Sequence, residues 1–141
     1  MSEGDLVQLV AYVTIARNEG AETVNCGSVD GHDIHIALGP HGGTEYDGII
    51  AEMIPQLPRP PSWDAATLNT LHTDHVQVLV LGGLNYDNEH LVNADPQHPK
   101  SGQPKRLSLW EIHPITAFLV CQRTDGCDAA HAEDWAPLTA R

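Results

Sequence analysis

A carboxylate and an imidazole stand two residues apart inside the apolar segment 107–121, LSLWEIHPITAFLVC. Side chains two residues apart on a β-strand point to the same face, so Glu111 and His113 would lie side by side. The opposite face would carry apolar side chains, namely Trp110, Ile112, Phe118 and Val120. Pro114 cannot donate a ladder hydrogen bond, so we expect it to interrupt the strand pairing. Polar groups in such a strand indicate either an internal hydrogen-bond network or part of a functional site.

Similar pairs of acids and histidines occur elsewhere in the chain. Asp33 and His35 are again two residues apart, and Asp87 and His90 stand three apart at an expected turn. A pair on one strand face can supply adjacent ligands to a divalent metal ion. A carboxylate can also hold the second ring nitrogen of a histidine that acts as a metal ligand or general base. The complete candidate set is Asp33, His35, Glu52, Asp87, His90, Glu111 and His113, with His35, His90 and His113 as candidate metal ligands.

A structural hydrogen-bond network explains the same residues and is favoured over a metal site. A buried, unpaired carboxylate is costly, so Glu52 would need a partner such as His35 or His113. Asp87 can equally cap backbone amides in its turn. The set therefore predicts a cluster that shapes a binding groove or contacts its ligand, and it identifies no catalytic residue.

The elements that would position these side chains can be read from hydrophobic periodicity and turn residues. Five strands are expected, at 6–17, 33–38, 47–54, 76–86 and 107–121, with a short extended piece at 23–26. A helix is expected at 62–72, with Ser62 as its N-cap. The Gly82–Gly83 pair indicates a bulge or bend in the fourth strand.

This order predicts an all-β fold with one short helix, namely a five-stranded Greek-key OB-fold-like barrel with the helix between strands three and four. A small antiparallel sandwich is the alternative, although it would need more strands and would leave the helix unexplained. We expect a single domain over residues 1–123, followed by an acidic C-terminal tail, 124–141, with a small helix near 128–135.

The charge balance narrows the class of partner. Nineteen acidic residues against seven basic ones give a formal charge of -12, which disfavours binding to nucleic acids and anionic lipids. Lys100, Lys105 and Arg106 form one local basic group. Such a group can still bind an anion, but solvated loop charge is the favoured interpretation. No apolar run reaches about 18 residues, and the first residues are acidic, so we expect a soluble, cytoplasmic protein without a membrane partner.

The three cysteines, Cys26, Cys121 and Cys127, lack the spacing of a zinc or redox motif. Buried free thiols are the default expectation. A disulfide between Cys26 and Cys121 would be feasible if the fold joined their strand ends, but a cytoplasmic setting argues against it.

Several short segments share an unusual composition: NC at 25–26, DIHIAL from Asp33, IIAEMIPQ from Ile49, RP at 59–60 followed by Trp63, GGLNYDNEH from Gly82 and SLWEIHPITAF from Ser108. Together they resemble a family of uncharacterised bacterial OB-fold-like proteins with the elements D-x-H, A-E-x-P, G-x-x-x-[FY]-D-x-x-H and [WL]-E-[IL]-H-P. The resemblance covers about residues 24–121, and WEIHP is its most specific element. It singles out the same acids and histidines and implies no activity.

The function predicted from the sequence is therefore a small soluble OB-fold binding module for an unidentified small ligand or protein. The first alternative is a metal-dependent hydrolase that uses the His/Asp/Glu cluster with a divalent metal ion as cofactor. The second is a single-stranded nucleic-acid binder, which the charge disfavours. The sequence does not specify the ligand, the oligomeric state or the biological process.

Overall fold

The computed structural model describes residues 1–19, 32–93 and 105–139. The elements in these ranges are β1 (Leu6–Asn18), β2 (Ile34–Gly39), the 3₁₀ helix η2 (Glu45–Asp47), β3 (Ile49–Met53), α1 (Ala65–Thr73), β4 (Gln77–Tyr86), β5 (Trp110–Cys121), the 3₁₀ helix η3 (Ala132–Asp134) and β6 (Trp135–Pro137). The strands and the helix expected from the sequence are all present, with bounds shifted by a few residues. The extended piece expected at 23–26 lies outside the described residues.

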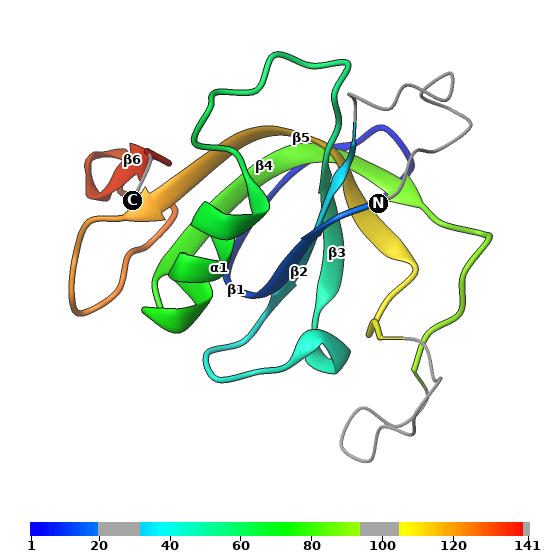
Figure 1. Ribbon diagram of the computed structural model, residues 1–141, viewed down its shortest axis with the longest axis horizontal. Helices are drawn as coiled ribbons and strands as arrows, with labels where there is room; N and C mark the ends of the chain where they lie inside the picture. The colour runs from blue at the N-terminus through cyan, green and yellow to red at the C-terminus, as the bar shows by residue number, and fades with distance from the viewer. Residues whose placement is uncertain (20–31, 94–104, 140–141) are drawn as a thin grey trace.

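Strands β1 to β5 close into a barrel, in which the curved β4 and β5 cross over β1, β2 and β3 (Figure 1). The long β1 pairs antiparallel with β4 through its first half and with β2 through its second half. β3 pairs with β2, β5 pairs with β4, and a parallel pairing between β3 and β5 closes the sheet. This strand order, with α1 between β3 and β4, is that of the OB-fold. The predicted fold class is confirmed and the alternative sandwich is wrong.

The barrel interior is filled by aliphatic and β-branched side chains, which suit the pleated inner face of a sheet. On β5, Ile112, Phe118 and Val120 belong to this core, as their alternation predicted. Trp110 was expected there as well, but it is half exposed and packs edge-to-face on Tyr86, with ring centroids 5.0 Å apart. The reason is its position at the first residue of β5, where the strand leaves the barrel.

Gly82 marks a bulge in the pairing of β4 with β5, because the register shifts on both sides of it. A Cβ atom at this position would meet the carbonyl oxygen of Pro114 and the side chain of Ile112. Glycine therefore allows the two backbones to approach closely here. The irregularity expected at Gly82–Gly83 and the interruption expected at Pro114 are both observed, and they coincide.

Helix α1 packs on the barrel through Leu68 and Leu71, which are fully buried in the core. Its N-cap is Asp64, whose side chain accepts a hydrogen bond from the Thr67 amide. The expected cap, Ser62, is wrong: its hydroxyl donates instead to a backbone carbonyl of the C-terminal segment. Ser62 is buried and its hydroxyl is engaged in this hydrogen bond, so Asp64 caps the helix instead.

The C-terminal segment adds a sixth strand, because β6 pairs antiparallel with the end of β5. This strand was not expected from the sequence; the small helix expected at 128–135 is a single 3₁₀ turn, η3. Cys121 forms a disulfide with Cys127. The prediction of free thiols is therefore wrong for these two cysteines, and the alternative bond between Cys26 and Cys121 is wrong as well. The turn after β5 brings these two side chains together, and Cys26 itself lies outside the described residues. No helix in the described ranges has the length and apolar character needed to cross a membrane.

Candidate functional site

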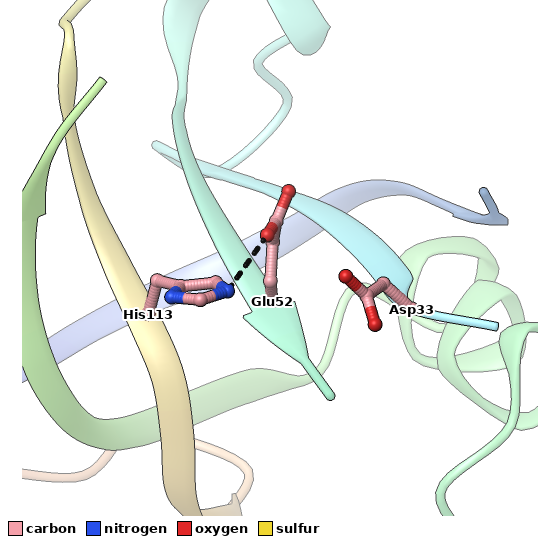
Figure 2. Close-up of side chains that lie close together, drawn as sticks. All are labelled: Asp33, Glu52 and His113. Carbon is pink, nitrogen blue, oxygen red and sulfur yellow. Dashed lines mark ion pairs between the residues drawn. The ribbon is translucent and has the colours of Figure 1, made fainter. Parts of the chain in front are cut away.

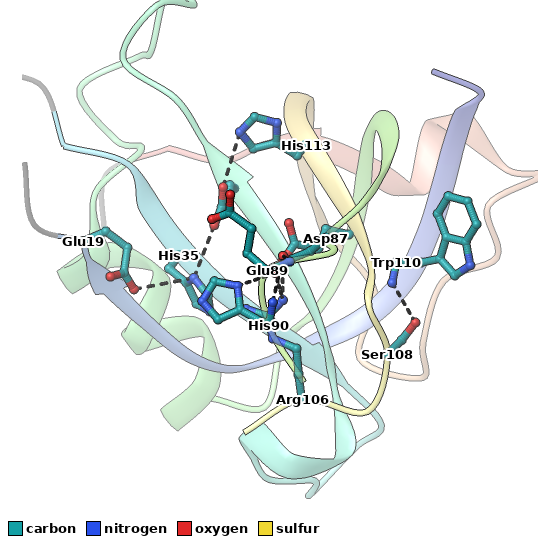
Figure 3. Close-up of polar contacts among 11 residues, drawn as sticks. Glu19, His35, Asp87, Glu89, His90, Arg106, Ser108, Trp110 and His113 are labelled. Carbon is teal, nitrogen blue, oxygen red and sulfur yellow. Dashed lines mark hydrogen bonds and ion pairs between the residues drawn. The ribbon is translucent and has the colours of Figure 1, made fainter. Parts of the chain in front are cut away.

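A polar cleft of about 430 Å³ opens where β2 and β3 meet the end of β4 and the start of β5 (Figure 3). Its lining residues are Glu19, His35, Glu52, Asn85, Tyr86, Asp87, Asn88, Glu89, His90, Arg106, Glu111 and His113. Most of them are charged or titratable. The cleft is therefore not a gap in apolar packing, and its clustered titratable groups make it the candidate functional site.

The structure brings the residues singled out from the sequence into one region. His35, Glu52, Asp87, His90, Glu111 and His113 line the cleft. Asp33 stands just before β2 and does not line the cleft, because it is only 3% exposed. One of its carboxylate oxygens nevertheless lies within 4.8 Å of a carboxylate oxygen of Glu52 and a ring nitrogen of His113.

Strand register explains this convergence. His35 on β2 is the direct partner of Glu52 on β3, and Asn85 on β4 is the partner of Glu111 on β5. The parallel pairing of β3 with β5 joins Ile50 to Glu111, so the next residues on the same face, Glu52 and His113, are also neighbours. The closure of the barrel thus places acids and imidazoles from three strands on one patch.

Glu52 is the centre of one group of contacts. Its Oε1 lies 3.4 Å from His35 Nδ1, and its Oε2 lies 3.3 Å from His113 Nε2. The same His35 nitrogen lies 3.5 Å from Glu19 Oε1. Burial raises the pKa of Glu52, but the hydrogen bond from His35 and the charges of His113, His35 and Arg106 outweigh burial and hold the pKa below its usual value. The partners expected for Glu52 are therefore both in contact with it.

Arg106 is the centre of a second group. Its Nη1 donates to Asp87 Oδ2 at 2.6 Å and to Glu111 Oε1, and the residue is only 7% exposed. The interpretation of Arg106 as solvated loop charge is wrong, because two buried carboxylates need a cation beside them. Lys105 pairs with Glu45 at 2.9 Å, and Lys100 lies outside the described residues.

The two carboxylates bound to Arg106 differ in protonation behaviour. Burial and the negative charge of Glu52 raise the pKa of Glu111 above its usual value, although Arg106 opposes them. Burial also raises the pKa of Asp87, but hydrogen bonds from the Glu89 amide and from His90, together with Arg106, lower it overall. The cleft therefore holds one carboxylate that retains its proton more readily than usual beside others that lose theirs easily.

Asp87 performs both roles considered from the sequence. Its Oδ1 accepts hydrogen bonds from the backbone amides of Glu89 and His90, as in a capped turn. Its Oδ2 lies 2.5 Å from His90 Nδ1, so the carboxylate also orients the ring. The imidazole itself is mostly exposed at the rim of the cleft.

One group of at least three potential metal ligands occurs within residues 1–19, 32–93 and 105–139: Asp33, Glu52 and His113 (Figure 2). Of the three candidate metal ligands, only His113 belongs to it. His35 contacts Glu52 Oε1, whereas His113 contacts Oε2, and His90 is held by Asp87.

Sequence reasoning missed Glu19, Glu89 and Arg106 as residues of the cleft. Glu89 lies within the segment already singled out at Asp87 and His90, so its neighbours were a usable signal. Glu19 follows β1, and its approach to His35 depends on the pairing of β1 with β2. Arg106 carried no local signal, because it stands in the loop before β5, while Asp87 lies 19 residues earlier, after β4, and Glu111 lies on β5.

No protein-family model, no curated protein and no solved structure matches this chain. The resemblance to an OB-fold-like family therefore stays a prediction, and the interpretation of the site depends on its geometry.

Proposed function

We propose that this protein is a small binding module whose cleft takes a positively charged ligand. The observation that supports this most directly is the charge of the cleft lining. It contains the carboxylates of Glu19, Glu52, Asp87, Glu89 and Glu111, and among the residues that the structure describes Arg106 is the only lining residue with a permanent positive charge. Since Arg106 is buried between Asp87 and Glu111, these two acids neutralise its charge, and Glu19, Glu52 and Glu89 are the further carboxylates of the lining.

The position of the cleft on the barrel supports the same proposal. OB-folds commonly bind ligands on the face of strands two and three, next to the loop between strands four and five. The cleft uses β2, β3 and the ends of β4 and β5 that flank this loop. This second argument is an analogy at the level of the fold, and it concerns the place rather than the chemistry.

A single-stranded nucleic-acid binder is disfavoured by the same charges. Proteins of that class present a basic groove with aromatic side chains on which bases stack. Tyr86 is exposed at the cleft, but acids surround it and the whole chain carries a formal charge of -12. Phosphates would therefore be repelled from this face.

The proposal is tested with small organic cations and anions as probes. Agmatine and spermidine should each shift the amide NMR signals of Tyr86, Asp87 and Glu111. A higher salt concentration should reduce the shifts caused by either cation, because salt screens the charges. Inorganic phosphate and adenosine monophosphate should leave the same signals in place. Equal shifts with the anions, or no cation-induced shifts at the cleft, would contradict the proposal.

A matched pair of variants separates the cleft from the general surface. Glu89 lines the cleft, whereas Glu133 is an exposed acid elsewhere that lies 3.5 Å from His131. Both Glu89→Gln and Glu133→Gln remove a single negative charge. We expect only Glu89→Gln to weaken agmatine binding, by about threefold, as the loss of a partly screened charge pair predicts. An equal effect of the two variants would indicate general attraction to the acidic surface.

The metal-dependent hydrolase is the second candidate function. An enzyme of this class activates a water molecule on a bound metal ion, so metal binding has to be demonstrated before this function is considered further. The cytoplasmic location also stays a prediction. Disulfides such as Cys121–Cys127 are typical of oxidising compartments, so the redox state of these cysteines in cells is the measurement that bears on location.

A further inference from the structure

Three candidate ligand residues from separate segments of the chain lie close together (Figure 2). Asp33 stands just before β2, Glu52 lies on β3 and His113 lies on β5. One oxygen from each acid and one imidazole nitrogen lie within 4.8 Å of one another. From this geometry we infer that Asp33, Glu52 and His113 bind a divalent transition-metal ion, which is the positively charged ligand, or part of it, in the function proposed above.

The spacing of Glu52 and His113 matches that of two ligands of one ion. Their facing atoms are 3.3 Å apart. Two ligands bound at about 2.0–2.1 Å to a tetrahedral zinc ion lie about 3.3–3.4 Å from each other. The Glu52–His113 pair already has this separation.

The third ligand lies farther from the other two. The Asp33 oxygen is within 4.8 Å of the ligand atoms of Glu52 and His113, whereas ligands of a tetrahedral ion with bonds of about 2.1 Å are about 3.4 Å apart. Binding of a shared ion therefore requires the Asp33 carboxylate to move inward.

The charges of the group match a divalent ion. Asp33 and Glu52 as carboxylates with a neutral His113 carry two negative charges, which one divalent ion neutralises. Two oxygens and one imidazole nitrogen suit Zn²⁺ or Mn²⁺, whereas Ca²⁺ and Mg²⁺ prefer oxygen ligands alone. The donor set therefore favours a transition metal over the alkaline-earth ions.

The surroundings provide both support and access. His35 holds the other oxygen of Glu52 at 3.4 Å and lies 3.5 Å from Glu19, which is the outer arrangement that orients carboxylate ligands in metal sites. The side chain of His113 is 35% exposed and that of Glu52 is 17% exposed, so the site opens into the cleft. Three protein ligands with an open side leave coordination positions for water or for an exchangeable ligand.

The test is calorimetric titration of the untagged full chain, stripped of metal by a chelator, with ZnCl₂ and with MnCl₂. We expect a single equivalent of at least one of these ions to bind. Glu52→Gln and His113→Gln should each weaken binding by at least about tenfold, the range seen when metal sites lose a supporting group. Asp33→Asn should do the same, provided that its amide NMR spectrum remains that of the folded protein.

Two residues of the same types away from the cleft are the matched controls. Glu133→Gln and His131→Gln remove the same groups from a neighbouring pair outside the cleft, and we expect each to change the affinity by less than about threefold. Addition of Co²⁺ gives a second readout, because nitrogen and oxygen ligands in a protein site produce a visible absorption band that the Glu52→Gln variant should lose.

Three outcomes would overturn the inference. They are no binding of either ion by the unaltered chain, equal weakening by the control and site variants, and unchanged affinity in both Glu52→Gln and His113→Gln. If agmatine still binds the cleft in any of these cases, the proposed binding module stands and only the metal site is rejected. If the metal binds as expected but agmatine and spermidine do not, the metal site stands and the broader preference for organic cations is rejected.

Discussion

Replacing Arg106 by methionine should destabilise the protein strongly, because this side chain neutralises two buried carboxylates. Arg106 contacts both Asp87 and Glu111, and the side chains of all three are at most 10% exposed. Methionine keeps much of the aliphatic stem but removes the charge. Breaking a buried ion pair by removing one partner costs about 3–5 kcal/mol. We expect a loss of about 3 kcal/mol, at the lower end, because Asp87 retains its contacts with His90 and two backbone amides.

The assay is urea unfolding followed by tryptophan fluorescence. With a urea dependence of about 2 kcal/mol per molar, a loss of about 3 kcal/mol lowers the midpoint by about 1.5 M. The double variant Arg106→Met/Glu111→Gln should recover a large part of the loss, since it removes one of the two carboxylates left without a cation. The difference between the single and double variants measures the cost of the unpaired Glu111.

The loss should also depend on pH, with a definite sign. Burial and the charge of Glu52 already raise the pKa of Glu111, and removal of Arg106 raises it further. A carboxyl with a raised pKa in the folded state favours folding at low pH, and this contribution is lost as the pH rises through that pKa. The Arg106→Met variant should therefore lose more stability at about pH 8 than at about pH 5. A loss below about 1 kcal/mol, or one that is equal at both pH values, would show that water screens this network and would refute the reasoning.

Three further predictions concern the fold. Asp64→Ala should lower the free energy of unfolding, measured with urea at neutral pH, by about 1 kcal/mol. Hydrogen bonds from Thr67 lower the pKa of Asp64, so its stabilising contribution is present above about pH 4 and is lost as the pH falls through the lowered pKa. The difference in stability between the variant and the unaltered protein should therefore become smaller in acid. Gly82→Ala should cost about 1–3 kcal/mol, since its Cβ would collide with β5, whereas Gly83→Ala should cost clearly less because its nearest contact is 3.3 Å away; equal melting temperatures would contradict this. The double variant Cys121→Ser/Cys127→Ser should lose about 2 kcal/mol, since the disulfide closes a loop between residues six positions apart, and reduction of the unaltered protein should give the same loss.

Much of the barrel could be predicted because its signals are local. Ile112, Phe118 and Val120 are separated by even numbers of residues, which indicates one common face of the strand, and the core contains all three. Gly82 lacks a Cβ atom and Pro114 lacks an amide hydrogen, so each marks an irregularity of the strand that could be placed without knowledge of the partner strand. The order of strands and helix then left few topologies to consider.

Signals that depend on a distant partner could not be read in this way. Ser62 and Asp64 are both good helix caps, and the choice between them depends on a carbonyl of the C-terminal segment that accepts from Ser62. The sequence alone allows Cys121 to pair with either of the other two cysteines. The turn after β5 brings Cys127 next to Cys121, and these two form the disulfide. A three-residue β6 is too short for a periodic pattern to reveal it.

The amino-acid sequence by itself determined which faces of the strands are apolar and which acids and histidines interrupt them, because side-chain direction alternates within a strand. Only the tertiary structure decided which of these polar groups meet. The parallel pairing of β3 with β5 brings Glu52 to His113, and the loop before β5 carries Arg106 between Asp87 and Glu111. Ion pairing and metal coordination both require side chains from separate segments to lie within a few ångströms of one another. Those short distances exist only after the barrel has closed.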